Sequence, residues 1–254
     1  FVRRYAPVRL GAVPLCGEGH VCRRDCHMGA QFRTEKVGVS EVANFEFTAR
    51  FDDGQWRLYG DKWFCSCAGA EVALVLARPE GAPKDNSGLA IFAVPRHLED
   101  GSRNKYRFVR LKDKMGTKSM ASGEAKFEGA VGYAFGDVGA KKNPGLRQMM
   151  DQVVMSRLSH GVRASGMMRR CLNEALVTAQ NREVFGEPII EKPLLRRQLL
   201  KMMIPTEQAL SMFLHVATQM HAADNGDKEA ERLNRILTPL LKFRTCRDNV
   251  AVAG

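Results

Sequence analysis

The sequence predicts an α+β protein in which an antiparallel β-barrel or sandwich is followed by an antiparallel helical bundle. Between about residues 29 and 143 the apolar residues recur with a period close to two, which is typical of strands. After residue 143 the apolar period becomes helical. Residues 1–28 are basic and cysteine-bearing without a convincing period, so we expect an irregular segment there.

The expected β domain, residues 29–143, contains two kinds of strand pattern. Three segments alternate between apolar and polar residues: 44–51, 56–59 and 106–111. Two segments are continuously apolar, as in strands covered on both faces: 72–76 and 89–94. Turn-forming residues separate these strands at 52–54, 79–81 and 100–101. Short strands with frequent turns favour a barrel or a sandwich.

The first helix of the expected helical domain, residues 144–254, has a clear start and stop. Asn143 is a residue type that suits an N-cap, and Pro144 suits the first helical position. Gly186 and Pro188 are expected to mark the end of this helix. Three small residues would let a neighbouring helix approach it closely: Gly161, Ala164 and Gly166.

Two further helices are expected, one from about residue 194 to 221 and one from about residue 228. Pro205 should kink the first of these two, because proline lacks the N–H that the helix needs. Three long amphipathic helices in series predict an antiparallel bundle.

Composition limits the classes of protein and partner. The 254 residues carry a formal net charge of +11, and such a field attracts nucleic acid, acidic membrane or a phosphate-bearing cofactor without choosing among them. No apolar run reaches the ~18 residues of a membrane-spanning helix. Seven cysteines without a disulfide spacing favour a reducing, cytoplasmic setting, or the mitochondrial matrix or a peroxisome in a eukaryote.

Motifs for several common chemistries are absent, including G-x-G-x-x-G, the phosphate loop, G-x-S-x-G and H-E-x-x-H. One cluster contains residues that zinc selects: Cys16, His20, Cys22, Cys26 and His27. Its spacing lacks the paired C-x2-C of common zinc modules, so we interpret these residues as unpaired groups in a loop and expect no metal. Cys65 and Cys67, two residues apart on an expected strand, are interpreted as packing residues.

Four segments carry the functional argument, and they occur in the order known from one family. They are T-E-K-V-G-V-S-E-V at 34–42, K-W-F-C-S at 62–66, K-M-G-T-K-S-M-A-S at 114–122 and R-E-V-F-G at 182–186. Together they resemble the T-E-x-x-G-G-S-D-V, K-x-W/F-I-T/S-N, M-G-x-R-x-S and R-x-x-F-G segments of the acyl-CoA dehydrogenase superfamily. The stretches 100–104 and 110–114 are similar to the branch that includes bacterial DNA-alkylation-response flavoproteins.

The resemblance covers about residues 29–254 and implies the middle β domain and part of the helical carboxyl domain of this family. It implies an incomplete member, because the amino-terminal helical domain and the last portion of the carboxyl domain have no counterpart. Five positions depart from the family pattern: Arg33, Val39, Glu41, Lys118 and Pro193.

The resemblance implies that FAD is the cofactor. Thr34 and the backbone of Gln31 and Arg33 would bind the pyrimidine edge of the flavin, and Ser40 would reach its phosphate end.

The K-W-F-C-S segment would contact the flavin ring itself. Phe64 would pack against the isoalloxazine, Ser66 would form a hydrogen bond near N5, and Cys65 lies between them in the cofactor-binding segment. In a homo-oligomer, a tetramer or dimer of dimers, Arg182 would reach the FAD pyrophosphate of a neighbouring subunit, with Phe185 beside it.

By resemblance, the reaction is the α,β-dehydrogenation of an acyl-CoA substrate. A carboxylate base removes the α-proton while a hydride leaves the β-carbon for flavin N5. Some members place this base on the long helix before an arginine, where this chain has Ser156 and Arg157. We therefore expect the base beyond residue 254 and little turnover from this chain alone. Arg157 is expected to line the substrate cavity, or else to be an interior arginine in an ion pair.

Two alternatives come from other functional classes. One is a flavin-bearing, DNA-associated protein of the alkylation response with little acyl-CoA turnover, for which the charge and the branch resemblance argue. The other is an inactive interaction module that serves as a scaffold in an oligomer. The sequence identifies neither the acyl-chain length nor the electron acceptor.

Overall fold

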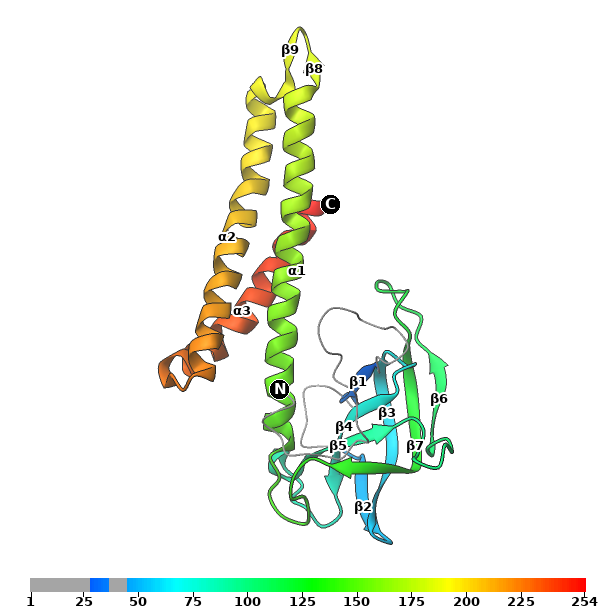
Figure 1. Ribbon diagram of the computed structural model, residues 1–254. Coiled ribbons are helices and arrows are strands. Elements are labelled where there is room, and N and C mark those ends of the chain that lie inside the picture. Colours follow the sequence, from blue (N-terminus) through cyan, green and yellow to red (C-terminus); the bar gives the residue numbers. More distant parts are fainter. Residues whose placement is uncertain (1–27, 37–44) are drawn as a thin grey trace. The chain divides into compact units, whose positions relative to one another are not determined.

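The computed structural model describes residues 28–36 and 45–254 (Figure 1). The Cys/His cluster at 16–27 and Ser40 lie outside the described residues. The chain divides into two compact units, residues 1–149 and 150–254, and each is described by itself.

The first unit contains a closed ring of five strands. Its described elements are β1 (Gly29–Phe32), β2 (Thr48–Asp52), β3 (Gln55–Ser66), β4 (Val72–Pro79), the short 3-10 helix η2 (Asn86–Gly88), β5 (Ala90–Pro95), β6 (Tyr106–Leu111) and β7 (Ser122–Ala134). The ring runs β4–β2–β3–β7–β5 and returns to β4. β1 is added beside β4 and β6 beside β7, so the expected barrel is confirmed.

The sequence predicted an antiparallel barrel, but the barrel also contains parallel pairs. β2 and β4 pair in parallel, as do β1 and β4. Strands in a closed ring can alternate in direction only when their number is even, so a ring of five must contain a parallel pair.

Both faces of β4 and β5 are covered, as their continuously apolar sequences predicted. Val75 and Phe92 point into the core inside the barrel. On the other face Leu76 and Ile91 belong to a second cluster with Met149, which lies near the start of α1 (Gly145–Asn181). The first turn of this helix therefore covers the outer face of the two strands.

A two-residue turn joins β2 to β3, as the residues at 52–54 predicted. Asp53 and Gly54 have φ angles of 49° and 74°. Positive φ at both positions is the type I′ geometry, which matches the twist of a hairpin. The turn sets the register in which Asp52 faces Gln55.

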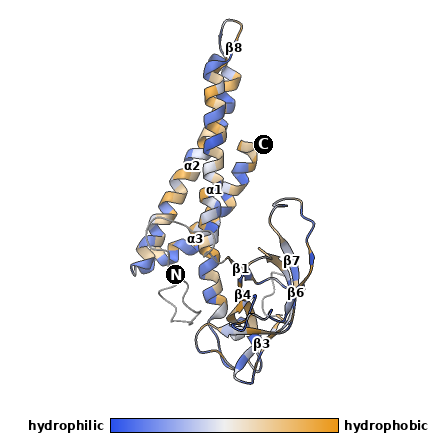
Figure 2. Ribbon diagram, turned by 45° about the vertical axis from the view of Figure 1, so that its right-hand side comes forward, coloured by the Kyte–Doolittle hydropathy of each residue, from blue (hydrophilic) through white to orange (hydrophobic). Residues whose placement is uncertain are grey.

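The second unit is a three-helix bundle, as predicted. It comprises most of α1, a short hairpin of β8 (Glu183–Val184) and β9 (Glu187–Pro188), the 3-10 turn η3 (Ile189–Glu191), α2 (Pro193–Asp224) and α3 (Lys228–Ala253). Figure 1 shows α2 returning alongside α1 from the hairpin. The three helices meet at Met168, Ala209 and Val252. Apolar and polar residues are mixed along each helix (Figure 2), and no described helix is long and apolar enough to cross a membrane.

Two local predictions at the ends of α1 were wrong. Asn143 does not cap α1, because its side-chain oxygen accepts the Gly139 N–H at 3.4 Å and its amide donates to the Gly139 and Lys141 carbonyls of the preceding loop. The helix ends at Asn181, and Gly186 instead occupies the turn of the β8–β9 hairpin. α2 continues through Pro205, and the kink expected at this residue stays a prediction.

One glycine contact on α1 confirms the expected close approach of a neighbouring helix. A Cβ atom added at Gly161 would lie 2.6 Å from Leu241 Cγ on α3. Gly166 is different, because an added Cβ there would meet nothing within 4 Å.

Candidate functional site

A backbone hydrogen bond joins the two segments that carry the expected flavin-binding residues. The Trp63 N–H of β3 donates to the Thr34 carbonyl, which follows β1, at 2.8 Å. Thr34 therefore lies beside the strand residue that immediately precedes Phe64. The structure thus brings the residues expected at the pyrimidine edge next to those expected at the flavin ring.

An irregularity in β3 sets the direction of the side chains at this point. Lys62 pairs with Ala125 and Cys65 with Gly123, so β3 has one more residue than β7 between these pairs, as in a β-bulge. Phe64 is 48% exposed and Ser66 is exposed, whereas Lys62 and Cys65 are buried. Phe64 and Ser66 therefore present an aromatic ring and a hydroxyl outward from the same strand.

The Cys65 thiol does not share this outward face. Its side chain is fully buried in the barrel core, where burial raises the pKa of the thiol to about 12. The expected packing role of its side chain is confirmed, since Cys65 belongs to the core cluster of the barrel. Cys67 lies beyond the end of the strand at a φ of 58°, so the expectation that both thiols share one strand face was wrong.

Ser66 is connected to the loop that contains the K-M-G-T-K-S segment. Its hydroxyl lies 3.2 Å from the Ser122 hydroxyl, which also accepts a hydrogen bond from Lys114 Nζ at 3.1 Å. Lys114 Nζ donates a second hydrogen bond to the Met120 carbonyl at 2.6 Å. Three of the four family-like segments therefore meet at one end of the barrel.

Two charged residues at this site were missed as functional candidates. Glu35 and Lys62 form a buried ion pair, with Glu35 Oε1 and Lys62 Nζ 2.8 Å apart. Burial lowers the pKa of Lys62 to about 8, against the opposing effect of Glu35. The sequence could have indicated them, because Lys62 is a charged residue at an inward position of a strand and Glu35 is a charged residue directly after Thr34.

Trp63 and Phe64 are surrounded by cations. Lys112 Nζ lies 3.0 Å from the centre of the Trp63 ring and 4.8 Å from the centre of the Phe64 ring. Glu124 accepts hydrogen bonds from Lys112 and Arg110, which lowers the pKa of its carboxyl group. The cations beside the aromatic pair are thus partly neutralised by one carboxylate.

Two family models match the chain in sequence. The acyl-CoA dehydrogenase middle domain matches residues 30–130, and the acyl-CoA dehydrogenase C-terminal domain matches residues 143–254. The chain belongs to the acyl-CoA dehydrogenase family.

Individual acyl-CoA dehydrogenase relatives cover most of this chain. AidB of Escherichia coli strain K12 is 36% identical over 254 residues, spanning 95% of this chain and 44% of AidB. Acyl-CoA dehydrogenase family member 11 of Caenorhabditis elegans is 33% identical, spanning 84% of this chain and 35% of the relative. A crystal structure of Caenorhabditis elegans ACDH-11 in complex with C11-CoA has a TM-score of 0.77 at 30% identity, covering 90% of this chain and 39% of that one. The chain thus spans less than half the length of these relatives.

In this acyl-CoA dehydrogenase chain the side chain of Gln31 points toward the start of α1. Its amide contacts Met149 Sδ at the start of α1. The role expected of the Gln31 backbone stays a prediction.

The remaining expected site residues lie in the helical unit. Arg157 is half-buried on α1 and forms no ion pair with any described residue. Arg182 is exposed directly after the helix, and Phe185 is 95% exposed in the hairpin turn. A positive φ, here 57°, is unusual for a phenylalanine.

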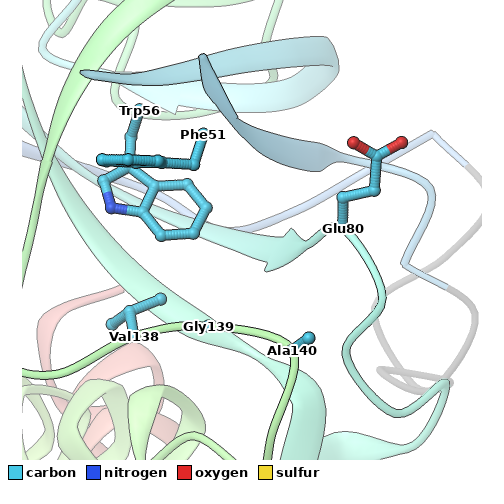
Figure 3. A pocket seen from close by; sticks show the side chains of 6 residues that line it. All are labelled: Phe51, Trp56, Glu80, Val138, Gly139 and Ala140. Carbon is cyan, nitrogen blue, oxygen red and sulfur yellow. The ribbon is translucent and has the colours of Figure 1, made fainter. Parts of the chain in front are cut away.

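A shallow pocket of about 390 Å³ lies at the other end of β3 (Figure 3). The rings of Phe51 and Trp56 lie 5.2 Å apart on one side, and Val138 faces them from the loop before α1. Trp56 and Ser66 are ten residues apart along the strand, or roughly 30 Å. This pocket is therefore separate from the flavin-binding candidate. Among the described residues, no group of three or more His, Cys, Asp or Glu could hold a metal ion.

Proposed function

We propose that this protein is an FAD-dependent oxidoreductase that acts on the CH–CH group of acyl-CoA thioesters. The observation that carries the proposal is the hydrogen bond between Trp63 and Thr34, which places Thr34 beside the outward-facing Phe64 and Ser66. The relatives add support, because several are named acyl-CoA dehydrogenases and one was crystallised with C11-CoA.

The exposed side chains fit an isoalloxazine. A flavin needs flat apolar packing on its ring and hydrogen bonds along its polar edge, and bound FAD would supply the hydride acceptor. Phe64 offers an exposed ring face for this packing. The Ser66 hydroxyl has one partner, Ser122, and a hydroxyl can form further hydrogen bonds. Ser66 can therefore bond near flavin N5 without losing its present contact.

Other residues would complete the cofactor site. Thr34 and the backbone groups of Gln31 and Arg33 would bind the pyrimidine edge. Among the described strands β1 pairs only with β4, which leaves its other edge open to a ligand. Ser40 would serve the phosphate end of FAD, and Arg157, which has no ion-pair partner among the described residues, would line the acyl-CoA cavity.

We also propose a homo-oligomer in which the β8–β9 hairpin reaches a neighbouring subunit. Phe185 is almost fully exposed, and Arg182 stands at the base of the same hairpin with its guanidinium free to pair with a phosphate. Exposed apolar residues continue along α2 and α3, including Leu200, Ile204, Ile236 and Phe243. Burying such side chains against a second copy would be favourable.

Absorbance of the purified protein tests the proposed function. We expect the protein to bind FAD, and acyl-CoA to perturb the visible band of the oxidised flavin. Phe64→Ala should raise the Kd for FAD about tenfold, because it removes roughly 1–2 kcal/mol of ring packing. Phe51→Ala, which removes an exposed ring at the opposite end of the barrel, is the matched control. Absence of FAD binding, or equal effects of the two substitutions, would contradict the proposal.

The DNA-associated alternative is supported chiefly by the net charge of +11. Two described cations near the proposed flavin site, Arg110 and Lys112, already pair with Glu124, which weakens a polyanion surface there. We also infer a cytoplasmic location, because the four described cysteines, Cys65, Cys67, Cys171 and Cys246, are all free thiols.

A further inference from the structure

Directly behind the expected flavin-binding residues lies an ion pair that is almost completely removed from water. The side chains of Lys62 and Glu35 are 0% and 4% exposed, and their charged atoms are 2.8 Å apart. Such a pair costs several kcal/mol in desolvation for each ion and repays it only when geometry and further hydrogen bonds are good. A buried pair is therefore weak evidence for stability, and another role must be considered.

The contacts of this pair converge on one tripeptide, Arg33-Thr34-Glu35. Lys62 Nζ donates to the Glu35 carboxylate and lies 3.4 Å from the Arg33 carbonyl. The backbone N–H of the next residue, Trp63, donates to the Thr34 carbonyl at 2.8 Å. Two consecutive residues of β3 thus hold all three residues of the tripeptide.

The pair itself has little freedom to move. The second oxygen of Glu35 accepts the Glu46 N–H at 2.8 Å. The ammonium group of Lys62 lies 4.4 Å from the centre of the Phe45 ring and 4.2 Å from that of Phe47. A cation between two aromatic rings is attracted to both, so these contacts offset part of its lost hydration.

We propose that Glu35 and Lys62 are positioning residues for the isoalloxazine of FAD, which fix the separation between Thr34 and the outward-facing pair Phe64 and Ser66. The inference rests on the proposed function. A flavin must meet its hydrogen-bonding partners and its packing surface at the same time, so the two segments that supply them must keep a fixed spacing.

The contacts of Lys62 with Glu35 and with the Arg33 carbonyl depend on the charge of Lys62, and therefore on pH. Burial lowers the pKa of Lys62 to about 8. Above that pH the ammonium group loses its proton, and its attachments to Glu35 and the Arg33 carbonyl weaken. Two further described groups interact with the pair: Arg78 with Glu35, and Cys65 with Lys62. Cys65 keeps its proton between pH 7 and 9, because its own pKa is raised to about 12. FAD affinity should therefore fall as pH rises from 7 to 9.

The double substitution Glu35→Leu and Lys62→Met tests the proposal in the full chain. Replacing a buried pair by apolar residues of similar size is often neutral for stability. We expect a folded protein with a melting temperature close to that of the wild type, a Kd for FAD raised at least tenfold, and no change in affinity between pH 7 and 9. Arg50→Met with Glu80→Leu is the matched control, because this 3.7 Å pair is exposed on the same barrel.

The outcomes separate the two proposals. A wild-type chain that binds no FAD overturns both. A wild-type chain that binds FAD, together with a folded double variant of unchanged affinity, overturns the positioning role and leaves the proposed function intact. If the double variant does not fold, Lys62→Arg replaces it. This substitution keeps the charge but changes the length, and should also raise the Kd tenfold. Wild-type affinity in Lys62→Arg would overturn the positioning role equally.

Discussion

Cys65 shows how burial changes the chemistry of a single side chain. Its thiol lies in the barrel core, and burial raises its pKa from 9.0 to about 12. In the unfolded chain the thiol loses its proton above about pH 9, whereas in the native protein it keeps the proton until about pH 12. The unfolded state therefore binds fewer protons in this window, and the free energy of unfolding falls as pH rises through it.

We predict that this thiol makes the protein sensitive to alkali. Between pH 7 and pH 10.5 its contribution to the free energy of unfolding should fall by about 2 kcal/mol, at 1.36 kcal/mol for each pH unit above 9. Urea unfolding under reducing conditions should show this extra loss in the wild type and not in Cys65→Ala. Lys62 changes stability in the opposite direction, but it is present in both proteins and cancels in the comparison. Cys67→Ala keeps the Cys65 thiol and should retain the wild-type slope, and a loss of slope in that variant would contradict the assignment.

Among residues, the sequence indicated which side chains lie near one another better than it indicated which are buried. The ordered segments pointed to Thr34, Phe64 and Ser66, and the structure places them at one end of the barrel. The burial of Glu35 and Lys62 was not predictable, because it depends on strands that are distant in the sequence. Lys62 is 27 residues from Glu35 and becomes its partner only when β3 passes the end of β1.

At the scale of elements, α1 and α3 cross at a point where one glycine replaces a side chain. A Cβ at Gly161 would lie 2.6 Å from Leu241 Cγ, and Leu241 is fully buried and cannot move aside. The close approach of the two helices therefore depends on the absence of a methyl group.

We predict opposite effects for two glycine substitutions on this helix. Gly161→Ala should lower the melting temperature, because overpacking costs about 1–3 kcal/mol and exceeds the gain of up to ~1 kcal/mol in helix propensity. Gly166→Ala should raise it, because an added Cβ there meets nothing within 4 Å. Thermal unfolding followed by circular dichroism distinguishes the two. Equal stabilisation by both would mean that the helices do not pack closely at Gly161.

Periodicity and turn residues predicted β2 to β6, the β2–β3 turn and the three long helices, but they did not predict β1, β7 or the β8–β9 hairpin. The misses have local causes. The side chain of Asn143 can either cap a helix or form hydrogen bonds within its own loop. In the structure it bonds to the loop, at the carbonyls of Gly139 and Lys141. Gly186 was predicted to end a helix. A glycine with positive φ is common both after a helix end and in a type I′ turn, so the residue type alone does not distinguish the two.

At the scale of the whole molecule, the two units have separate hydrophobic cores. Phe47, Leu58 and Phe92 belong to the barrel core, whereas Met168 and Ala209 belong to the core of the helical unit. Proteins with more than one core need not unfold in a single transition.

We predict two transitions in differential scanning calorimetry of the full chain. FAD at about 100 times its Kd should stabilise the unit that binds it by about 2.7 kcal/mol, and so raise the barrel transition more than the other. Gly161→Ala should lower the helical transition and thereby assign it. The prediction fails if FAD raises the transition that Gly161→Ala lowers.

The bulge in β3 changes which side chains of the strand face inward and which face outward. Counted by strict alternation from the inward Lys62, residue 64 would face inward, residue 65 outward and residue 66 inward. The single extra residue shifts this count by one, so that Phe64 and Ser66 emerge to solvent while Lys62 remains enclosed. One inserted position thus allows the same short stretch of chain to supply a buried cation to the interior and a ring and a hydroxyl to the exterior.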